Sequence, residues 1–246
     1  FSGYTDMALG ASLLFNIRLP INFNSPYRAT DIQDFWRRWH ITLSRFLRDY
    51  LYIPLGGNRK GRARMHINLF LTFTLGGLWH GATWMFVLWG ALHGLAMVVQ
   101  RTWRLAGGRM PAWLAWFITF NFINVTWVVF RAKDMEAARN VLAGMLGLQG
   151  MMPPAGGLPG TSWSRALGDT PESWMGLLGG VTASYVSIGL ALLMVLATRN
   201  STGLWMQPGA WRQLTPARAL EYGLVAALAL LAMLSSRYSE FIYFNF

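Results

Sequence analysis

The histidines are the residues of this chain best suited to chemistry at neutral pH, and three of the four lie in an uncharged run. Residues 65–100 contain no Asp, Glu, Lys or Arg, yet His66, His80 and His93 occur there. An imidazole titrates at about pH 6.5 and can therefore transfer protons under physiological conditions. Ionisable groups inside apolar segments are costly and usually functional, so each of these histidines is a candidate.

The stretch around His80 is the unusual one. It reads GGLWHGATW over residues 76–84, so glycines interrupt the apolar run on both sides of the imidazole. For His66 we favour an interfacial position at the start of a helix, and for His93 a packing role with a hydrogen bond to a neighbouring carbonyl. For His40, in a basic segment, the case for a functional role is stronger than for His66 and His93 but weaker than for His80. No packing explanation of equal strength exists for His80, which is the first candidate for catalysis.

Other chemistries fit the sequence less well. The histidines match no compact metal-ligand spacing and the chain has no cysteine, so we predict no metal site. The GxSxG motif of serine hydrolases is absent. A membrane transporter remains the rival from a different class, because polar breaks in apolar helices also form substrate paths. The predicted spans after Met65 contain almost no charge until Glu221, whereas ion-coupled carriers usually need carboxylates inside the membrane.

The composition is that of a membrane protein. Hydrophobic residues make up 54% of the 246 positions and charged residues 13%, against about a quarter charged in soluble domains. The runs 65–100, 111–130, 174–198 and 219–236 approach or exceed the roughly 20 apolar residues that cross a bilayer. The net charge of +11 lies mainly in the loops between them, as the positive-inside rule expects, so we do not predict nucleic-acid binding. We predict an all-α, polytopic membrane protein.

The uncharged run must fold back on itself. A straight helix of this length would span about 54 Å, whereas the hydrocarbon core is about 30 Å thick. We expect the break at Gly76, Gly77 and Gly81, which gives a re-entrant-like hairpin. An arm over residues 65–79 rises only about 22 Å, so the turn would lie below the far surface. His80 is then predicted to sit in a polar pocket that opens toward the extracytoplasmic side.

A basic segment, residues 30–64, precedes this hairpin. The string TDIQ has capping-box spacing, which predicts a helix N-cap at Thr30. At helical periodicity the following residues form one amphipathic helix, with His40 at the edge of its apolar face, and such a helix lies in the membrane interface. The apolar face comprises Phe35, Trp36, Trp39, Leu43, Phe46, Leu47 and Tyr50, the basic face Arg37, Arg38, Arg45 and Arg48, and Ile41 is the exception.

The remaining segments complete the expected topology. Residues 1–20 form a helix cut at its start, in which Asp6 is equally well explained as a cap or interfacial charge and as a site residue. The helix 111–130 crosses outward, 131–172 is an extracytoplasmic loop, 174–198 returns and 219–236 crosses outward again.

Five strings carry a family resemblance: FSGYTDMALG, INFNSPYRATDIQDFWRRWHITLSRFLRDYLYIPLGGNRKG, LGGLWHGATWMFVLWGALHG, WVVFRAKD and FIYFNF. Together they resemble the membrane-bound O-acyltransferase (MBOAT) family, in particular its bacterial alginate O-acetyltransferase branch. The resemblance covers essentially the whole chain. Family chains are longer, so we expect residues 1–246 to be the C-terminal portion of one MBOAT-type helical bundle.

The resemblance implies an O-acyltransferase of the bacterial inner membrane. It implies that His80 is the catalytic residue and that His40 is a second functional position. Acetyl-CoA is the expected co-substrate, with no permanently bound cofactor, and the acceptor is a hydroxyl of an extracytoplasmic polysaccharide such as alginate. Periplasmic acetyltransferase proteins and membrane lipids are the expected partners. Transfer of D-alanyl or another acyl group to peptidoglycan, cellulose or teichoic acid is the alternative.

Acyl transfer needs a base for the acceptor hydroxyl and hydrogen-bond donors for the oxyanion. We predict that His80 is the base and that Trp79, or backbone N–H groups near Gly81, supply the oxyanion donors. His40 orients His80 or holds the donor. The predicted substrate- and donor-binding residues are Asp6, Trp79, Arg45, Arg48 and Lys60, with Arg59 beside them. For the basic residues, anchoring to lipid headgroups is at least as good an explanation as binding the phosphates of coenzyme A.

Overall fold

The computed structural model describes residues 1–148, 181–198, 200 and 215–235, and every regular element among them is helical. The expected all-α class is therefore confirmed for this part of the chain. The chain divides into two compact units, residues 1–24 with 199–246, and residues 25–198. The smaller unit contains α1 (Ser2–Leu14) and α12 (Pro216–Ser235). The larger unit contains η1 (Pro26–Arg28), α2 (Ile32–Arg38), α3 (Ile41–Leu47), η2 (Arg48–Tyr52), α4 (Gly61–His80), α5 (Trp84–Leu105), α6 (Ala112–Arg131), α7 (Met135–Met145) and α10 (Val181–Ala197).

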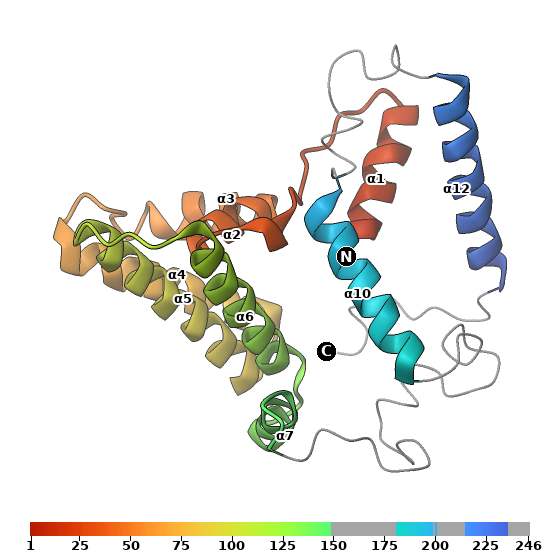
Figure 1. Cartoon of the computed structure of the whole chain (residues 1–246). Helices are drawn as coiled ribbons and strands as arrows, with labels where there is room; N and C mark the ends of the chain where they lie inside the picture. Colours follow the sequence, from red (N-terminus) through yellow and green to blue (C-terminus); the bar gives the residue numbers. More distant parts are fainter. Residues whose placement is uncertain (149–180, 199, 201–214, 236–246) are drawn as a thin grey trace. The chain divides into compact units, whose positions relative to one another are not determined.

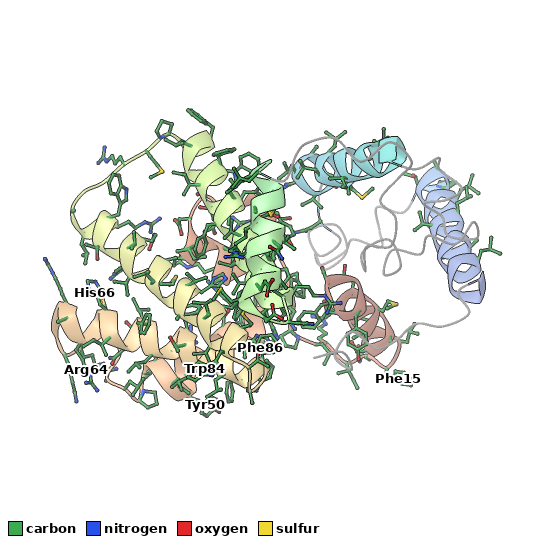
Figure 2. All side chains as sticks on the ribbon, turned by 90° about the horizontal axis from the view of Figure 1, so that it is seen from below. Phe15, Tyr50, Arg64, His66, Trp84 and Phe86 are labelled. Atoms are coloured by element: carbon green, nitrogen blue, oxygen red, sulfur yellow. The ribbon has the colours of Figure 1, made fainter. Side chains whose placement is uncertain are left out.

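The centre of the larger unit is the pair of helices α4 and α5, which run side by side with α6 along α5 (Figure 1). α2 and α3 pack against this pair. Figure 2 shows Arg64 and His66 near one end of α4, and Phe86 toward the other end of the pair. The uncharged run 65–100 thus folds back on itself, with the reversal at residues 81–83.

Glycines bring α4 and α5 into backbone contact. A Cβ on Gly77 would lie 2.2 Å from the Phe86 carbonyl oxygen, and a Cβ on Gly90 would lie 2.4 Å from the Phe73 carbonyl oxygen. Gly94, one turn after Gly90, meets Phe70 in the same way, at 2.9 Å from its carbonyl oxygen. Small residues four apart allow apolar helices to approach this closely. Packing is therefore the reason for these glycines.

The expected break at Gly76 and Gly77 is wrong. Both glycines lie inside α4, which continues without interruption from Gly61 to His80 and ends only at Gly81. At 20 residues the helix is about 30 Å long, enough to match the hydrocarbon thickness. Helix length therefore does not force the turn below the membrane surface, because α4 starts four residues earlier than the apolar run.

The amphipathic segment forms two short helices where one was expected. α2 ends at Arg38 and α3 starts at Ile41, with Trp39 extended and His40 in the left-handed region at φ 43°. This break shifts the helical phase, which explains why Ile41, the exception on a single helix, is buried. The N-cap of α2 is Asp31, one residue after the predicted Thr30, and its carboxylate accepts the Asp34 N–H at 2.7 Å.

The later segments agree in part with the expected spans. Among the described residues, α6 is the one helix both long and apolar enough to cross a membrane, so the polytopic topology stays a prediction. The segment 131–172, expected to be a loop, contains α7, whose N-cap Asp134 accepts the Ala137 N–H at 2.8 Å. Residues 149–172 of that loop, 174–180 of the next span and residue 236 of the last lie outside the described residues.

Replacing Gly90 tests the contact between α4 and α5. We expect Gly90→Ala to lower the thermal unfolding midpoint in detergent, because its Cβ would overlap the Phe73 carbonyl and force the helices apart. Overpacking of this kind costs about 1–3 kcal/mol. Gly189→Ala in α10 is the matched control, since nothing lies within 4 Å of the added Cβ. Equal midpoints for both variants would contradict the close approach.

Candidate active site

His80 is the last residue of α4 and lies among aromatic rings from three helices. Its ring centroid is 4.9 Å from that of Trp79, 5.3 Å from Trp89 and 5.2 Å from Phe130, all edge-on, and 6.2 Å from Phe86. The imidazole is half-buried. Trp79, the predicted oxyanion donor, is next to His80 but is itself 58% exposed.

Gly81 allows the aromatic surroundings of His80 to close. A Cβ at this position would lie 2.6 Å from the Cε2 atom of Phe86. Phe86, at the start of α5, could not then approach the end of α4. The glycine after the histidine therefore brings the Phe86 ring against the imidazole, in addition to ending the helix.

His40 lies at the break between α2 and α3, in a conformation that is uncommon for residues other than glycine. The Ser44 hydroxyl stabilises the break by donating to the Trp36 carbonyl at 3.0 Å, and the Ser44 N–H donates to the His40 carbonyl at 3.0 Å. Burial lowers the pKa of His40 to about 4, because the charged imidazolium loses water contact. His40 is therefore neutral at physiological pH. Strained backbone of this kind concentrates at functional sites.

The structure brings the two predicted catalytic positions together. His40 is near enough to His80 for a charge on one imidazole to act on the other. They come from segments about 40 residues apart in sequence, so only the packing of α2 and α3 against α4 and α5 brings them within range of each other's charge.

His93 is buried, with 1% of its surface exposed, and links three helices. The Trp36 indole N–H of α2 donates to its Nδ1 at 3.1 Å, and its Nε2 lies 3.1 Å from the Thr126 hydroxyl of α6. The Thr126 hydroxyl donates in turn to the Ile123 carbonyl at 2.9 Å, so Nε2 must carry the proton that Thr126 accepts. The packing role expected for His93 is present, but its partners are two side chains, whereas a carbonyl was expected.

Trp89 connects the two histidines of the hairpin. Its ring centroid lies 5.3 Å from that of His80 and 4.7 Å from that of His93. The indole N–H is buried and has no acceptor among the described residues. A buried donor without an acceptor is costly, so this group, missed from the sequence, is a second candidate oxyanion donor beside Trp79.

A cavity of about 540 Å³ lies in the same unit and is strongly basic. Four guanidinium groups line it, from Arg37 of α2, Arg45 of α3, Arg48 of η2 and Arg101 of α5. Arg48 pairs with Asp49 at 2.7 Å, and this contact holds the pKa of Asp49 below its usual range. The other three make no ion pair with a described residue. Cationic charge without a partner favours an anionic ligand.

Only some of the predicted donor-binding residues line the cavity. Arg45 and Arg48 line the cavity, whereas Lys60 and Arg59 do not. The Lys60 side chain packs over Gly56. The sequence pattern placed Arg37 only on the basic face of a helix and did not single out Arg101, so both were missed as cavity residues. Asp6 lies on α1 in the smaller unit.

Comparison with known proteins identifies the family. The model of the membrane-bound O-acyltransferase family matches residues 1–133, which include His40, His80 and His93. The whole chain is 45% identical to a peptidoglycan O-acetyltransferase of Helicobacter pylori, over 46% of that protein. It is 50% identical over 139 residues, 56% of the chain and 27% of the relative, to a protein described as a probable alginate O-acetylase of Pseudomonas aeruginosa. A teichoic acid D-alanyltransferase of Bacillus subtilis is 34% identical over 55% of the chain and 38% of its own length. The chain thus spans less than half the length of these relatives.

Breaking the hydrogen-bond chain through His93 should destabilise the larger unit. We expect Thr126→Val to cost about 1–3 kcal/mol, because the buried Nε2–H of His93 would lose its acceptor while the side-chain volume hardly changes. Thermal unfolding in detergent measures the effect. Thr102→Val is the control, since the exposed Thr102 hydroxyl donates only to the Val98 carbonyl of its own helix. An equal, small effect of both substitutions would show that the chain contributes nothing.

Proposed function

The chain belongs to the membrane-bound O-acyltransferase family, and from this membership we propose that it forms the catalytic portion of an O-acyltransferase of the bacterial cell envelope. The observation that carries the proposal is the cavity lined by arginines, which Ile41, the residue after His40, also lines, in the same compact unit as His80. A base and an anion-binding cavity are the two elements that acyl transfer from a phosphate-bearing thioester requires.

The proposed donor is acetyl-CoA. Its phosphates would bind the guanidinium groups of Arg37, Arg45 and Arg101, which have no ion-pair partner among the described residues. Guanidinium groups bind phosphates by paired, charge-assisted hydrogen bonds. The cavity also has an apolar part, formed by residues such as Met97 and Leu69. This part suits the narrow arm of coenzyme A that ends in the thioester.

His80 acts as the base. Its neutral imidazole removes the proton of the acceptor hydroxyl as the oxygen attacks the thioester carbonyl carbon. Donors near His80, either Trp79, Trp89 or backbone N–H groups at Gly81, stabilise the resulting oxyanion. The intermediate then breaks its C–S bond, the thiolate leaves, and the imidazolium returns the proton to sulfur. The ester forms, coenzyme A is released and His80 is neutral again.

His40 supports this reaction as a neutral group. Because burial lowers its pKa to about 4, it places no positive charge next to His80 when His80 accepts a proton. A neutral imidazole can both accept and donate one hydrogen bond. We propose that His40 orients His80 or the donor, in agreement with the resemblance from which its role was expected.

The proposed acceptor is a hydroxyl of an extracytoplasmic polysaccharide. The proposed location of the chain is the inner membrane, which it crosses several times, and its proposed partners are periplasmic acetyltransferase proteins. Peptidoglycan is favoured over alginate, because the relative named for peptidoglycan aligns with the whole chain, whereas the alginate relatives align with 56–59% of it. Teichoic acid D-alanylation is the alternative, supported by lower identity over about half of the chain.

Substitution of His80 tests the assignment of the base. In the full-length protein we expect His80→Ala to lower acetyl transfer to the polymer by about 10²- to 10⁴-fold, the contribution of a positioned base. Acetyl esters released from isolated polymer give the measurement, with membrane abundance checked by immunoblot. His66→Gln is the control, because His66 lies three turns or more before His80 on α4. Undiminished acetylation by a His80→Ala protein present at normal abundance would overturn the assignment.

The arginine cavity makes a separate prediction. We expect Arg45→Gln and Arg101→Gln each to raise the KM for acetyl-CoA by about tenfold, the loss of one charge-assisted hydrogen bond, with little change in kcat. Arg62→Gln is the control, since Arg62 is exposed and does not line the cavity. If these arginines anchor lipid headgroups instead, KM will be the same in these variants as in Arg62→Gln. Purified protein that transfers no acetyl from any thioester, with a soluble acceptor and partner supplied, would favour the transporter.

A further inference from the structure

The arginine cavity does not reach His80. Neither His40 nor His80 lines it, although Ile41, the residue after His40, does. Three apolar lining residues, Trp36, Leu47 and Phe73, lie against Trp89, against α4 or within α4, the helix that ends at His80, and we call them the septum. The Trp36 ring centroid is 5.9 Å from that of Trp89, and Trp89 is 5.3 Å from His80. The path from the cavity to the imidazole is therefore blocked by side chains in contact.

One member of the septum is fixed and another is less constrained. Trp36 is 6% exposed and donates its indole N–H to His93, so rotation of its ring would break a buried hydrogen bond. Phe73 lies against it at 5.0 Å between ring centroids and is only partly buried. A rotation of Phe73 breaks no hydrogen bond, so it opens the septum at the lowest cost.

Leu47 closes the septum against α4. Its Cδ1 atom lies 3.0 Å from the position that a Cβ on Gly76 would occupy. Gly76 lies one turn before His80 on the same face of α4, since four residues separate them. Leu47 therefore fits against the last turn of α4 only because Gly76 has no side chain.

We propose that Trp36, Phe73 and Leu47 filter the acyl group by size, so that acetyl and other short acyl groups pass to His80 and longer ones do not. This inference rests on the proposed function, because it takes the thioester donor to occupy the arginine cavity. Each additional methylene must displace closely packed side chains, and a single methylene in a tight apolar site changes transfer by about tenfold or more. A narrow passage thus selects the smallest acyl group.

The experiment compares acetyl-CoA and hexanoyl-CoA as donors for full-length protein purified in detergent. The quantity measured is the ratio of kcat/KM for hexanoyl transfer to that for acetyl transfer. We expect Phe73→Ala to raise this ratio at least about tenfold, and Phe73→Leu to raise it less. Gly76→Ala should lower it, because the new Cβ presses Leu47 toward the passage. Phe117→Ala is the matched control, since Phe117 is 54% exposed on α6 and does not line the cavity.

The outcomes distinguish failure of the proposed filter from failure of the base assignment and from loss of folding. An unchanged ratio in both Phe73 variants, each with a normal unfolding midpoint, overturns the filter, and so does an equal fall of both rates in all septum variants. If Phe73→Ala does not fold, Phe73→Leu and Gly76→Ala decide by their opposite shifts. Loss of acetyl transfer in His80→Ala together with an unchanged ratio in Phe73→Ala leaves the proposed function standing and removes only the filter. Retained transfer in His80→Ala removes the base assignment, whatever the ratio does.

Discussion

The hydrogen-bond chain from Trp36 through His93 to Thr126 holds the larger unit together, since it joins α2, α5 and α6 at one buried imidazole. The Trp36 indole only donates and the Thr126 hydroxyl both accepts and donates, so only the neutral His93 with a proton on Nε2 satisfies both neighbours. His40 lies two residues after the end of α2, so its position depends on the attachment of Trp36. The septum depends on it too, because the same hydrogen bond fixes its tryptophan ring.

The glycines around His80 show what could and what could not be predicted from the sequence. His80 was selected from the glycines beside it, and the structure places it at the end of α4, while its catalytic role stays a prediction. Yet only Gly81 ends the helix, while Gly76 and Gly77 lie inside α4 where small residues face Leu47 and α5. A glycine in an apolar run has the same sequence signature whether it breaks a helix or lets another backbone approach, so periodicity could not separate the two.

The break between α2 and α3, a second difference from the expected fold, could have been predicted from the sequence. Ile41 did not fit a single amphipathic helix, and the structure shows that the helix stops just before it. Such a phase error marks a break more directly than any turn residue, because His40 adopts a left-handed conformation that sequence does not signal. The partners of His93, and the arrival of Arg101 beside Arg45, were beyond prediction since they join segments that are distant in the chain and meet only through tertiary packing.

The glycine contacts between α4 and α5 also affect how the protein responds to its lipid. Because the two main chains touch at Gly77 and Gly90, the helices cannot slide past each other without raising their separation. In the predicted polytopic topology, the pair would respond to a thicker or thinner bilayer by tilting as one rigid body. The depth of His80 relative to the lipid headgroups would then follow hydrocarbon thickness, while its distance to Trp89 stays constant. In that topology, lipid chain length would tune access to the imidazole without altering its surroundings.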